Sequence, residues 1–201
     1  LKKLEKENFS SDRYILSGDL MYDALKRQID KNNIVPKRQD YNVLTLHRQE
    51  NVENEERLLA IINAIIESDK YFHFPVHPRT KNSLEKFNLW DKIKDYKKIQ
   101  LLEPLSYSKF VNLVSYCDKV ITDSGGLRRE AYLLGKPCIV PINIIWFQDL
   151  VDSGWMTIVD NDQNKLIDKI INFNKEGKRE EFFGNGEAYK VIVKEILKCL
   201  N

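Results

Sequence analysis

The sequence predicts an α/β protein: a Rossmann-like three-layer α/β/α domain with a parallel sheet. After Pro36, short apolar segments alternate with longer segments whose apolar residues recur at helical spacing. This alternation is typical of repeated strand and helix units around a parallel sheet. The short segments are rich in β-branched residues and lack a clear apolar-polar alternation, as expected for strands that are buried on both faces.

Six strands are expected, at residues 42–46, 71–76, 98–102, 118–122, 137–141 and 156–160. A helix is expected over residues 54–68, because Asn54 is a suitable N-cap and two glutamates occupy the first turn. Its predicted apolar face consists of Leu58, Leu59, Ile62, Ile65 and Ile66. Further helices are expected over residues 106–117, 126–135, 165–174 and 187–200. Residues 17–41 are interpreted as a short strand and a helix that lead through a hinge into the repeating region.

The composition excludes several classes of protein. The chain has 201 residues, 42% of them hydrophobic, and a formal net charge of only +2 with acids and bases interspersed, so neither nucleic acid nor a membrane surface is expected as a partner. Cys117, Cys138 and Cys199 are an odd number without CxxC spacing, which predicts neither a disulfide framework nor a zinc site. A cytoplasmic location is expected, and no metal site.

Residues 122–137, TDSGGLRREAYLLGKP, place a Ser-Gly-Gly turn between a predicted strand and a predicted helix. Gly125 and Gly126 would let the backbone approach a phosphate closely, Ser124 adds a hydroxyl, and the N-terminus of the helix favours an anion. Glu130, about one turn further on, could accept hydrogen bonds from ribose hydroxyls. On spacing alone, a tight turn with nothing bound fits equally well.

Polar residues also follow the first three predicted strands. They are His47, Arg48, Glu50 and Asn51; then His77, Arg79 and Lys81; then Glu103, Ser106 and Tyr107. Because parallel strands end at one edge of a sheet, these groups are expected to face one crevice. His73 lies inside an apolar strand and is expected to be structural. Arg128, Arg129 and Lys136 could neutralise a diphosphate, but a solvated helix face explains each of them better when taken alone.

In this order, the segments LHRQEN, PVHPRT, EPLSYSKF and TDSGGLRREAYLLGKP closely resemble the UDP-N-acetylglucosamine 2-epimerase family of the non-hydrolysing type. The resemblance extends from SGDLMYDAL near the start to GNGEAYKVIVKEIL near the end. It implies that the chain is the C-terminal half of a GT-B fold. Residues 1–201 would then be a single Rossmann-like nucleotide-binding domain, with 1–35 as a hinge and the remnant of an absent N-terminal domain.

The resemblance also implies a reaction, in which UDP-N-acetylglucosamine and UDP-N-acetylmannosamine interconvert by elimination and re-addition of UDP. It assigns His47 and Glu50 to the chemistry, and UDP binding to His77, Arg79, Leu105, Tyr107, Phe110, Ser124, Gly125, Gly126 and Glu130. Among these, the Ser-Gly-Gly turn would hold the diphosphate, Glu130 the ribose, and the region 105–110 the uracil. No cofactor is implied. The main carboxylates of the family come from the first domain, so the chain alone is expected to be inactive.

The implied partners are UDP or a UDP-N-acetylhexosamine, the missing N-terminal Rossmann-like domain, and a second copy in a homodimer. One loop departs from the family pattern: Ile142, Ile145 and Trp146 stand where the family has Arg, Thr and Glu. A hydrophobic cap formed by Trp146 and Phe147 is expected here, with altered substrate contacts or reduced activity as alternatives. Two other functions are a non-catalytic UDP or UDP-sugar-binding module and a GT-B glycosyltransferase domain, although HRQEN argues against a transferase.

Overall fold

The computed structural model describes residues 7, 10 and 14–200. Contacts within the chain divide it into two compact units, one of Leu1–Lys31 with Glu180–Asn201 and the other of Asn32–Arg179. The first 13 residues, which begin with a charged stretch, lie outside the described part except for residues 7 and 10. None of the described helices is both long enough and apolar enough to cross a membrane.

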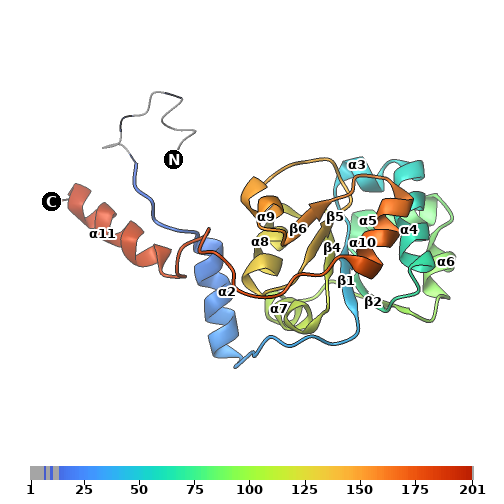
Figure 1. Ribbon diagram of the computed structural model, residues 1–201, viewed down its shortest axis with the longest axis horizontal. Coiled ribbons are helices and arrows are strands. Elements are labelled where there is room, and N and C mark those ends of the chain that lie inside the picture. The colour runs from blue at the N-terminus through green and yellow to red at the C-terminus, as the bar shows by residue number, and fades with distance from the viewer. Residues whose placement is uncertain (1–6, 8–9, 11–13, 201) are drawn as a thin grey trace. The chain divides into compact units, whose positions relative to one another are not determined.

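The larger unit is built on a six-stranded parallel sheet (Figure 1). Its strands are β1 (Asn42–Thr45), β2 (Phe72–Pro75), β3 (Ile99–Leu102), β4 (Val120–Thr122), β5 (Cys138–Val140) and β6 (Met156–Ile158). The strand order is β3-β2-β1-β4-β5-β6, and every neighbouring pair is parallel. All six predicted strands are present, each slightly shorter than predicted, and the doubly wound order is that of a Rossmann-like fold.

Helices cover both faces of this sheet, which confirms the three-layer prediction (Figure 1). They are α3 (Gln49–Val52), α4 (Glu55–Glu67), α5 (Pro78–Lys86), α6 (Trp90–Lys94), α7 (Tyr107–Tyr116), α8 (Gly125–Leu133), α9 (Gln148–Asp152) and α10 (Gln163–Asn172). Helices α3, α5, α6 and α9 are not among those predicted from the sequence. Three of these have only four or five residues, which is too short for a helical period to be visible.

Helix α4 begins and packs largely as its sequence predicts. The side chain of Asn54 accepts a hydrogen bond from the backbone N–H of Arg57 at 3.0 Å, so the predicted N-cap is confirmed. Its buried hydrophobic residues are Leu58, Ile61, Ile62, Ala64 and Ile65. The predicted burial of Leu59 is wrong: its side chain is 36% exposed, because it lies about 100° around the helix from Leu58 and faces away from the sheet.

The smaller unit contains α2 (Leu20–Lys31) and α11 (Ala188–Leu200). The carboxylate of Asp23 caps α11 by accepting hydrogen bonds from the backbone N–H groups of Ala188 at 3.0 Å and Tyr189 at 2.7 Å. The short strand predicted before α2 is wrong, because residues 14–19 are irregular. Along α11, the apolar side chains of Val193 and Ile196 are more than half exposed, at 52% and 53%.

Lys136 is buried at the end of the turn between α8 and β5, so its predicted place on a solvated helix face is wrong. Its Nζ donates to the carbonyl oxygens of Cys117 at 2.8 Å and Lys37 at 3.1 Å. Burial lowers the pKa of this amine, and the two carbonyl oxygens accept hydrogen bonds from its N–H groups in place of water. The lysine therefore connects the turn before β5 to the segments before β4 and β1 instead of facing solvent.

The packing of the core predicts that two isoleucines differ in how much their replacement by alanine lowers the free energy of unfolding. Ile121 on β4 is fully buried, whereas Ile171 on α10 is 44% exposed. We expect Ile121→Ala to lower the free energy of unfolding by about 2–5 kcal/mol, because it leaves a cavity in a packed core. The matched Ile171→Ala should cost no more than about 0.5 kcal/mol. Urea unfolding followed by circular dichroism checks both, and equal losses would contradict this view of the core.

Candidate functional site

The strand order reverses between β1 and β4, and the loops that leave these two strands lie side by side. Val43 pairs with Val120 and Thr45 with Thr122, so the two strands end at the same level. The hydroxyl groups of Thr45 and Thr122 are 2.6 Å apart, and Thr122 Oγ1 also accepts from the backbone N–H of Ser124 at 3.0 Å. In open parallel sheets, ligands bind in the crevice at this point of reversal.

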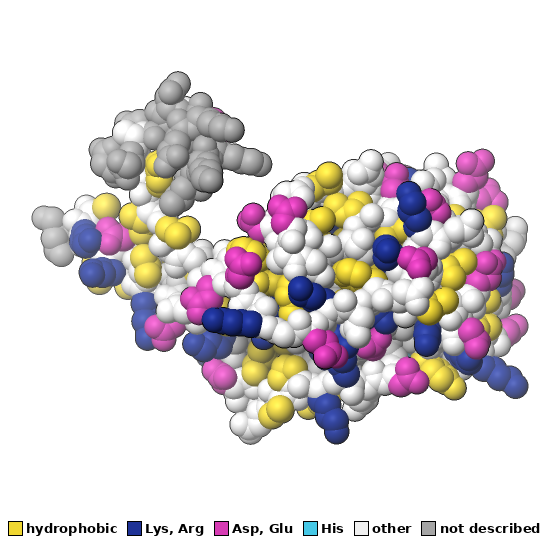
Figure 2. Space-filling model, viewed as in Figure 1, with side chains coloured by type: hydrophobic (Ala, Val, Ile, Leu, Met, Phe, Trp, Pro, Cys, Tyr) yellow, Lys and Arg dark blue, Asp and Glu magenta, His cyan; other side chains and the backbone are white. Residues whose placement is uncertain are grey.

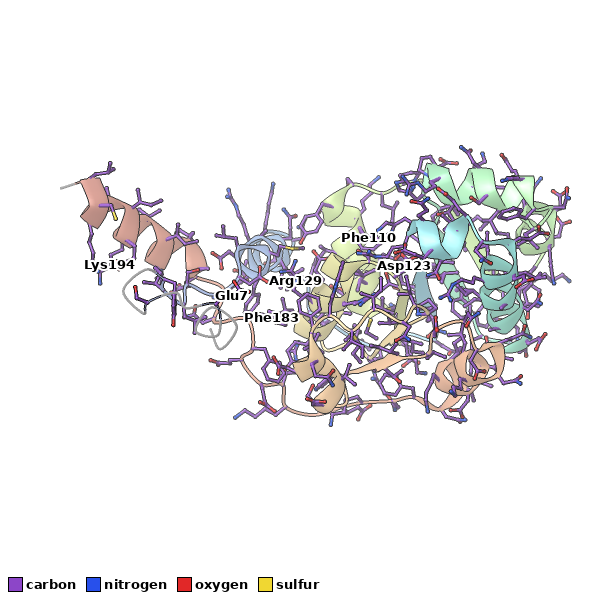
Figure 3. All side chains as sticks on the ribbon, turned by 90° about the horizontal axis from the view of Figure 1, so that it is seen from above. Glu7, Phe110, Asp123, Arg129, Phe183 and Lys194 are labelled. Atoms are coloured by element: carbon purple, nitrogen blue, oxygen red, sulfur yellow. The ribbon has the colours of Figure 1, made fainter. Side chains whose placement is uncertain are left out.

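Asp123 joins the two loops at this crevice. Its carboxylate is fully buried and accepts hydrogen bonds from the backbone N–H groups of His47 and Arg48, both at 3.1 Å. It also accepts from the side-chain amide of Asn51 in α3, again at 3.1 Å. Figure 3 labels Asp123 inside the larger unit, close to the strands. The chain after β1 is thereby fastened to the chain after β4.

The two predicted site histidines lie next to each other. His47 Nδ1 is 3.3 Å from the Asp123 carboxylate, and the ring centroids of His47 and His77 are 6.0 Å apart. His77 is the N-cap of α5, where Pro78 occupies the first turn and Nδ1 accepts from the backbone N–H of Arg79 at 3.2 Å. Thr80 Oγ1 donates to the carbonyl oxygen of Leu46, which ties the start of α5 to the end of β1.

Ser124 is the N-cap of α8, and the strand, turn and helix follow in the predicted order. Its hydroxyl oxygen accepts from the N–H of Leu127 at 3.4 Å, which leaves the hydroxyl hydrogen available to a ligand. Within the described part of the chain, no acceptor is recorded for the backbone N–H groups of Gly125 and Gly126. The first turn of α8 therefore offers the N–H donors and the positive helix end that suit an anion.

Trp146 packs directly on Gly125 at the start of α8, so its part of the predicted cap against a neighbouring helix is present. A Cβ atom added at Gly125 would lie 2.7 Å from the indole ring, so a glycine is needed here whether or not a ligand binds. The guanidinium carbon of Arg48 lies 4.3 Å from the indole centroid, and that of Arg128 lies 5.7 Å away, as in cation–π contacts. The indole is still 42% exposed, so its outer side faces solvent.

Arg128 is fully buried, which corrects the prediction that it belongs to a solvated helix face. Its guanidinium donates to the carbonyl oxygen of Ile144 at 2.9 Å and to that of Asp123 at 3.4 Å. Its Nε has no hydrogen-bond partner among the described residues, and burial lowers its pKa. Packing against the loop of residues 142–147, which carries Trp146, covers the arginine, and helical spacing alone could not predict that contact.

Glu130 and Tyr107 form a second polar cluster, which joins α8 to the start of α7. The phenol of Tyr107 donates to the Glu130 carboxylate at 2.7 Å. Glu130 is only 7% exposed, and this burial raises its pKa although the hydrogen bond from Tyr107 acts in the opposite direction. Leu105 and Phe110, predicted to contact uracil, are partly buried on either side of Tyr107 in the sequence.

Two predicted site residues are not brought into the cluster. Glu50 in the first turn of α3 and Arg79 in the first turn of α5 are both exposed, and within residues 14–200 neither side chain has a recorded contact with another predicted site residue. No group of three or more His, Cys, Asp or Glu side chains in this same part of the chain is placed to hold a metal ion. Acidic and basic side chains are interspersed over the face of the larger unit in Figure 2.

Asp123 and Thr80 are parts of this site that are not among the residues predicted from the sequence. Asp123 stood inside the quoted TDSGG segment, and a signal was present, because a carboxylate directly after a buried strand must find several donors. Asn51 was noted at a strand end without a role. Thr80 contacts a carbonyl group 34 positions away in the sequence, so nothing local marked it.

Comparisons with known proteins identify the family of the chain. A sequence model of the UDP-N-acetylglucosamine 2-epimerase family matches residues 1–197. The chain belongs to this family. It is 38% identical over 195 residues to a UDP-N-acetylglucosamine 2-epimerase homolog of Methanococcus maripaludis, covering 91% of this chain and 54% of that protein. It is 36% identical over 206 residues to the UDP-N-acetylglucosamine 2-epimerase of Methanocaldococcus jannaschii, covering 95% of this chain and 56% of that protein.

A solved structure of an epimerase of this family shares the fold. The crystal structure of the Methanocaldococcus jannaschii UDP-GlcNAc 2-epimerase in complex with UDP-GlcNAc and UDP superposes with a TM-score of 0.88 at 34% identity. The superposition covers 98% of this chain and 58% of that one. The chain thus spans about half the length of the epimerase family members it matches, and its predicted fold class is confirmed.

The buried position of Glu130 predicts how stability depends on pH. Because its pKa in the folded state is raised above the ordinary 4.5, the folded protein retains a proton that the unfolded chain has released, and stability falls as the pH rises through this window. We expect the stability of Glu130→Gln, relative to the native chain, to increase as the pH rises above the ordinary glutamate pKa of 4.5. Urea unfolding at several pH values measures this difference. The exposed Glu56→Gln is the control, and parallel curves for native and Glu130→Gln would refute the assignment.

Proposed function

We propose that this chain is the UDP-binding C-terminal domain of a UDP-sugar 2-epimerase, which interconverts UDP-N-acetylglucosamine and UDP-N-acetylmannosamine. The observation that carries the proposal is the convergence of His47, His77 and the first turn of α8 at the point where the strand order reverses. Membership of the epimerase family and the UDP and UDP-GlcNAc in the complex of the 34%-identical epimerase support the same ligand class.

The nucleotide would bind across the carboxyl ends of β1 and β4. Ser124, Gly125 and Gly126 would donate to the diphosphate, with His77 and Arg79 as further donors. Glu130 would accept from the ribose hydroxyls, in place of or together with the hydrogen bond that it accepts from Tyr107. Leu105 and Phe110 would contact the uracil from the α7 side.

The chemistry would be an elimination followed by re-addition. A base removes the proton from C2 of the sugar while the bond from C1 to the UDP oxygen breaks, which gives a glycal and free UDP. Protonation of C2 on the opposite face, with return of UDP to C1, then yields the epimer. His47 and Glu50 would take part in the proton transfers, and the N–H donors of α8 would stabilise the negative charge that develops on the leaving diphosphate.

A complete site would need a second wall. The matched relatives are nearly twice as long as this chain, and we propose that a preceding Rossmann-like domain supplies the remaining acid and base groups. The exposed apolar side chains of α11, Val193 and Ile196 among them, offer a surface that such a domain or a second copy could cover. A homodimer and a cytoplasmic location remain predictions from the sequence.

A second candidate function is a module that binds UDP or a UDP-sugar without turnover. The loop of residues 142–147 favours it, because Ile142, Ile145 and Trp146 stand where the family pattern has Arg, Thr and Glu, so polar groups that could act on the sugar are missing there. The two candidates differ in what the full-length protein does with UDP-N-acetylglucosamine, since only the epimerase produces UDP-N-acetylmannosamine.

Calorimetry with UDP and an epimerisation assay test the proposal together. The chain of 201 residues should bind UDP weakly and show no epimerisation, because the site has one wall. Glu130→Ala should weaken UDP binding by about 1–3 kcal/mol if the carboxylate takes the ribose hydroxyls, whereas Glu56→Ala should not change it. Unchanged affinity in Glu130→Ala removes this residue from the site, and UDP binding without turnover by the full-length protein selects the module.

Removal of the indole should make the anion site easier to reach. We expect Trp146→Ala to strengthen UDP binding about two- to fivefold, because a ligand would no longer compete with a cation–π contact to Arg48 worth about 0.5–1 kcal/mol. Ile145→Ala in the same loop is the control, since this side chain is 59% exposed. Weaker UDP binding by Trp146→Ala would mean that the indole belongs to the binding surface and does not obstruct it.

A further inference from the structure

We propose that His47 and His77 both present Nε2 to the site in opposite hydrogen-bonding roles, which are fixed before any ligand arrives. In this assignment His47 carries its proton on Nδ1, directed at Asp123, and exposes Nε2 as an acceptor. His77 carries its proton on Nε2 and exposes it as a donor. Asp123 is then a positioning residue that acts through His47. The consequence for catalysis rests on the proposed function, but the assignment itself does not.

The partner of His47 fixes its tautomer. The Asp123 carboxylate can only accept hydrogen bonds, and its Oδ1 lies 3.3 Å from His47 Nδ1. Three donors reach Oδ2, namely the backbone N–H groups of His47 and Arg48 and the amide of Asn51. Among the described residues, the one donor recorded for Oδ1 besides the nearby ring is the His47 backbone N–H. Because a fully buried carboxylate needs its donors, a proton on Nδ1 is favoured over a lone pair facing the negative charge.

The partner of His77 demands the opposite tautomer. The backbone N–H of Arg79 donates to His77 Nδ1 at 3.2 Å, so this nitrogen must carry the lone pair. The contact is the N-cap of α5, a helix of nine residues, and it gives the first-turn N–H of Arg79 an acceptor that the helix backbone cannot provide. A neutral His77 therefore holds its proton on Nε2. The ring is exposed, so this donor is accessible.

Backbone contacts hold the two rings in this relation. His47 is fastened to β4 through its own N–H and Asp123, and α5 is fastened to β1 through Thr80 and the carbonyl of Leu46. Their centroids are 6.0 Å apart with the planes tilted by 44°. A single ligand could therefore contact both side chains, one as an acceptor and the other as a donor.

The two roles follow if the site works as proposed. His47 can take a proton at Nε2 and become an imidazolium with both nitrogens protonated, and the adjacent Asp123 carboxylate offsets the new positive charge. His77 can donate a hydrogen bond from Nε2 to a phosphate oxygen without losing its proton. The two histidines would thus have different roles, one as the base and the other as the phosphate contact, because their local hydrogen bonds differ.

Nitrogen-15 NMR of the native chain tests the assignment directly. The chain has three histidines, His47, His73 and His77, so His47→Gln and His77→Gln suffice to assign the ring signals. Long-range correlations at about pH 8.5, some two units above the ordinary histidine pKa of about 6.5, report the neutral tautomers. We expect Nδ1–H for His47 and Nε2–H for His77. The same tautomer for both rings, or the reverse pair, would overturn the proposal.

Asp123→Asn then tests the positioning role. An asparagine would keep its oxygen toward the three donors at the Oδ2 position and turn its NH₂ toward His47, so we expect His47 to change to Nε2–H while His77 does not change. An unchanged His47 would refute a role for Asp123. If this variant fails to fold by circular dichroism, the native spectrum still decides the assignment. A separate UDP titration distinguishes failure of the tautomer assignment from failure of the proposed function. If the expected tautomers are found but UDP does not bind, only the proposed function is contradicted.

Discussion

The arrangement of the site depends on one buried carboxylate. Asp123 lies at the end of β4, and the donors that reach it come from the chain after β1 and from α3. Burial of an ionised carboxylate is costly unless hydrogen bonds replace its hydration, and here three backbone or amide donors do so, with His47 Nδ1 3.3 Å from one carboxylate oxygen. Because the buried carboxylate of Asp123 needs these donors, it also fixes the path of the loop that carries His47.

The topology of the sheet explains why these groups meet. Crossover connections from β1 to β2 and β3 run in one direction along the sheet, whereas those from β4 to β5 and β6 run in the other. The loops after β1 and β4 consequently diverge onto opposite faces and leave a crevice between them, with the start of α8 on one side. The buried guanidinium of Arg128 adds positive charge at this crevice. Among the described residues it has no carboxylate ion pair, because its hydrogen-bond acceptors are two carbonyl oxygens.

Periodicity and strand-end chemistry predicted much of this molecule. The strands were recognisable because buried parallel strands are continuous β-branched segments, and the Ser-Gly-Gly turn marked the start of α8. Tertiary contacts decided the rest. The burial of Arg128 and Lys136 depends on carbonyl groups from distant loops, and the place of Thr80 depends on Leu46, so no local pattern predicts them. The roles of the site residues in binding and chemistry stay predictions.

The close packing of Trp146 on Gly125 links two segments that a sequence comparison would treat as independent. Any side chain at position 125 would displace the indole, and a smaller residue at 146 would remove the steric reason for glycine. The turn and the loop are thus expected to vary together among relatives. An exchange of this loop between family members would therefore need the turn at position 125 to be transferred with it. A glycine at 125 is by itself a poor marker of nucleotide binding.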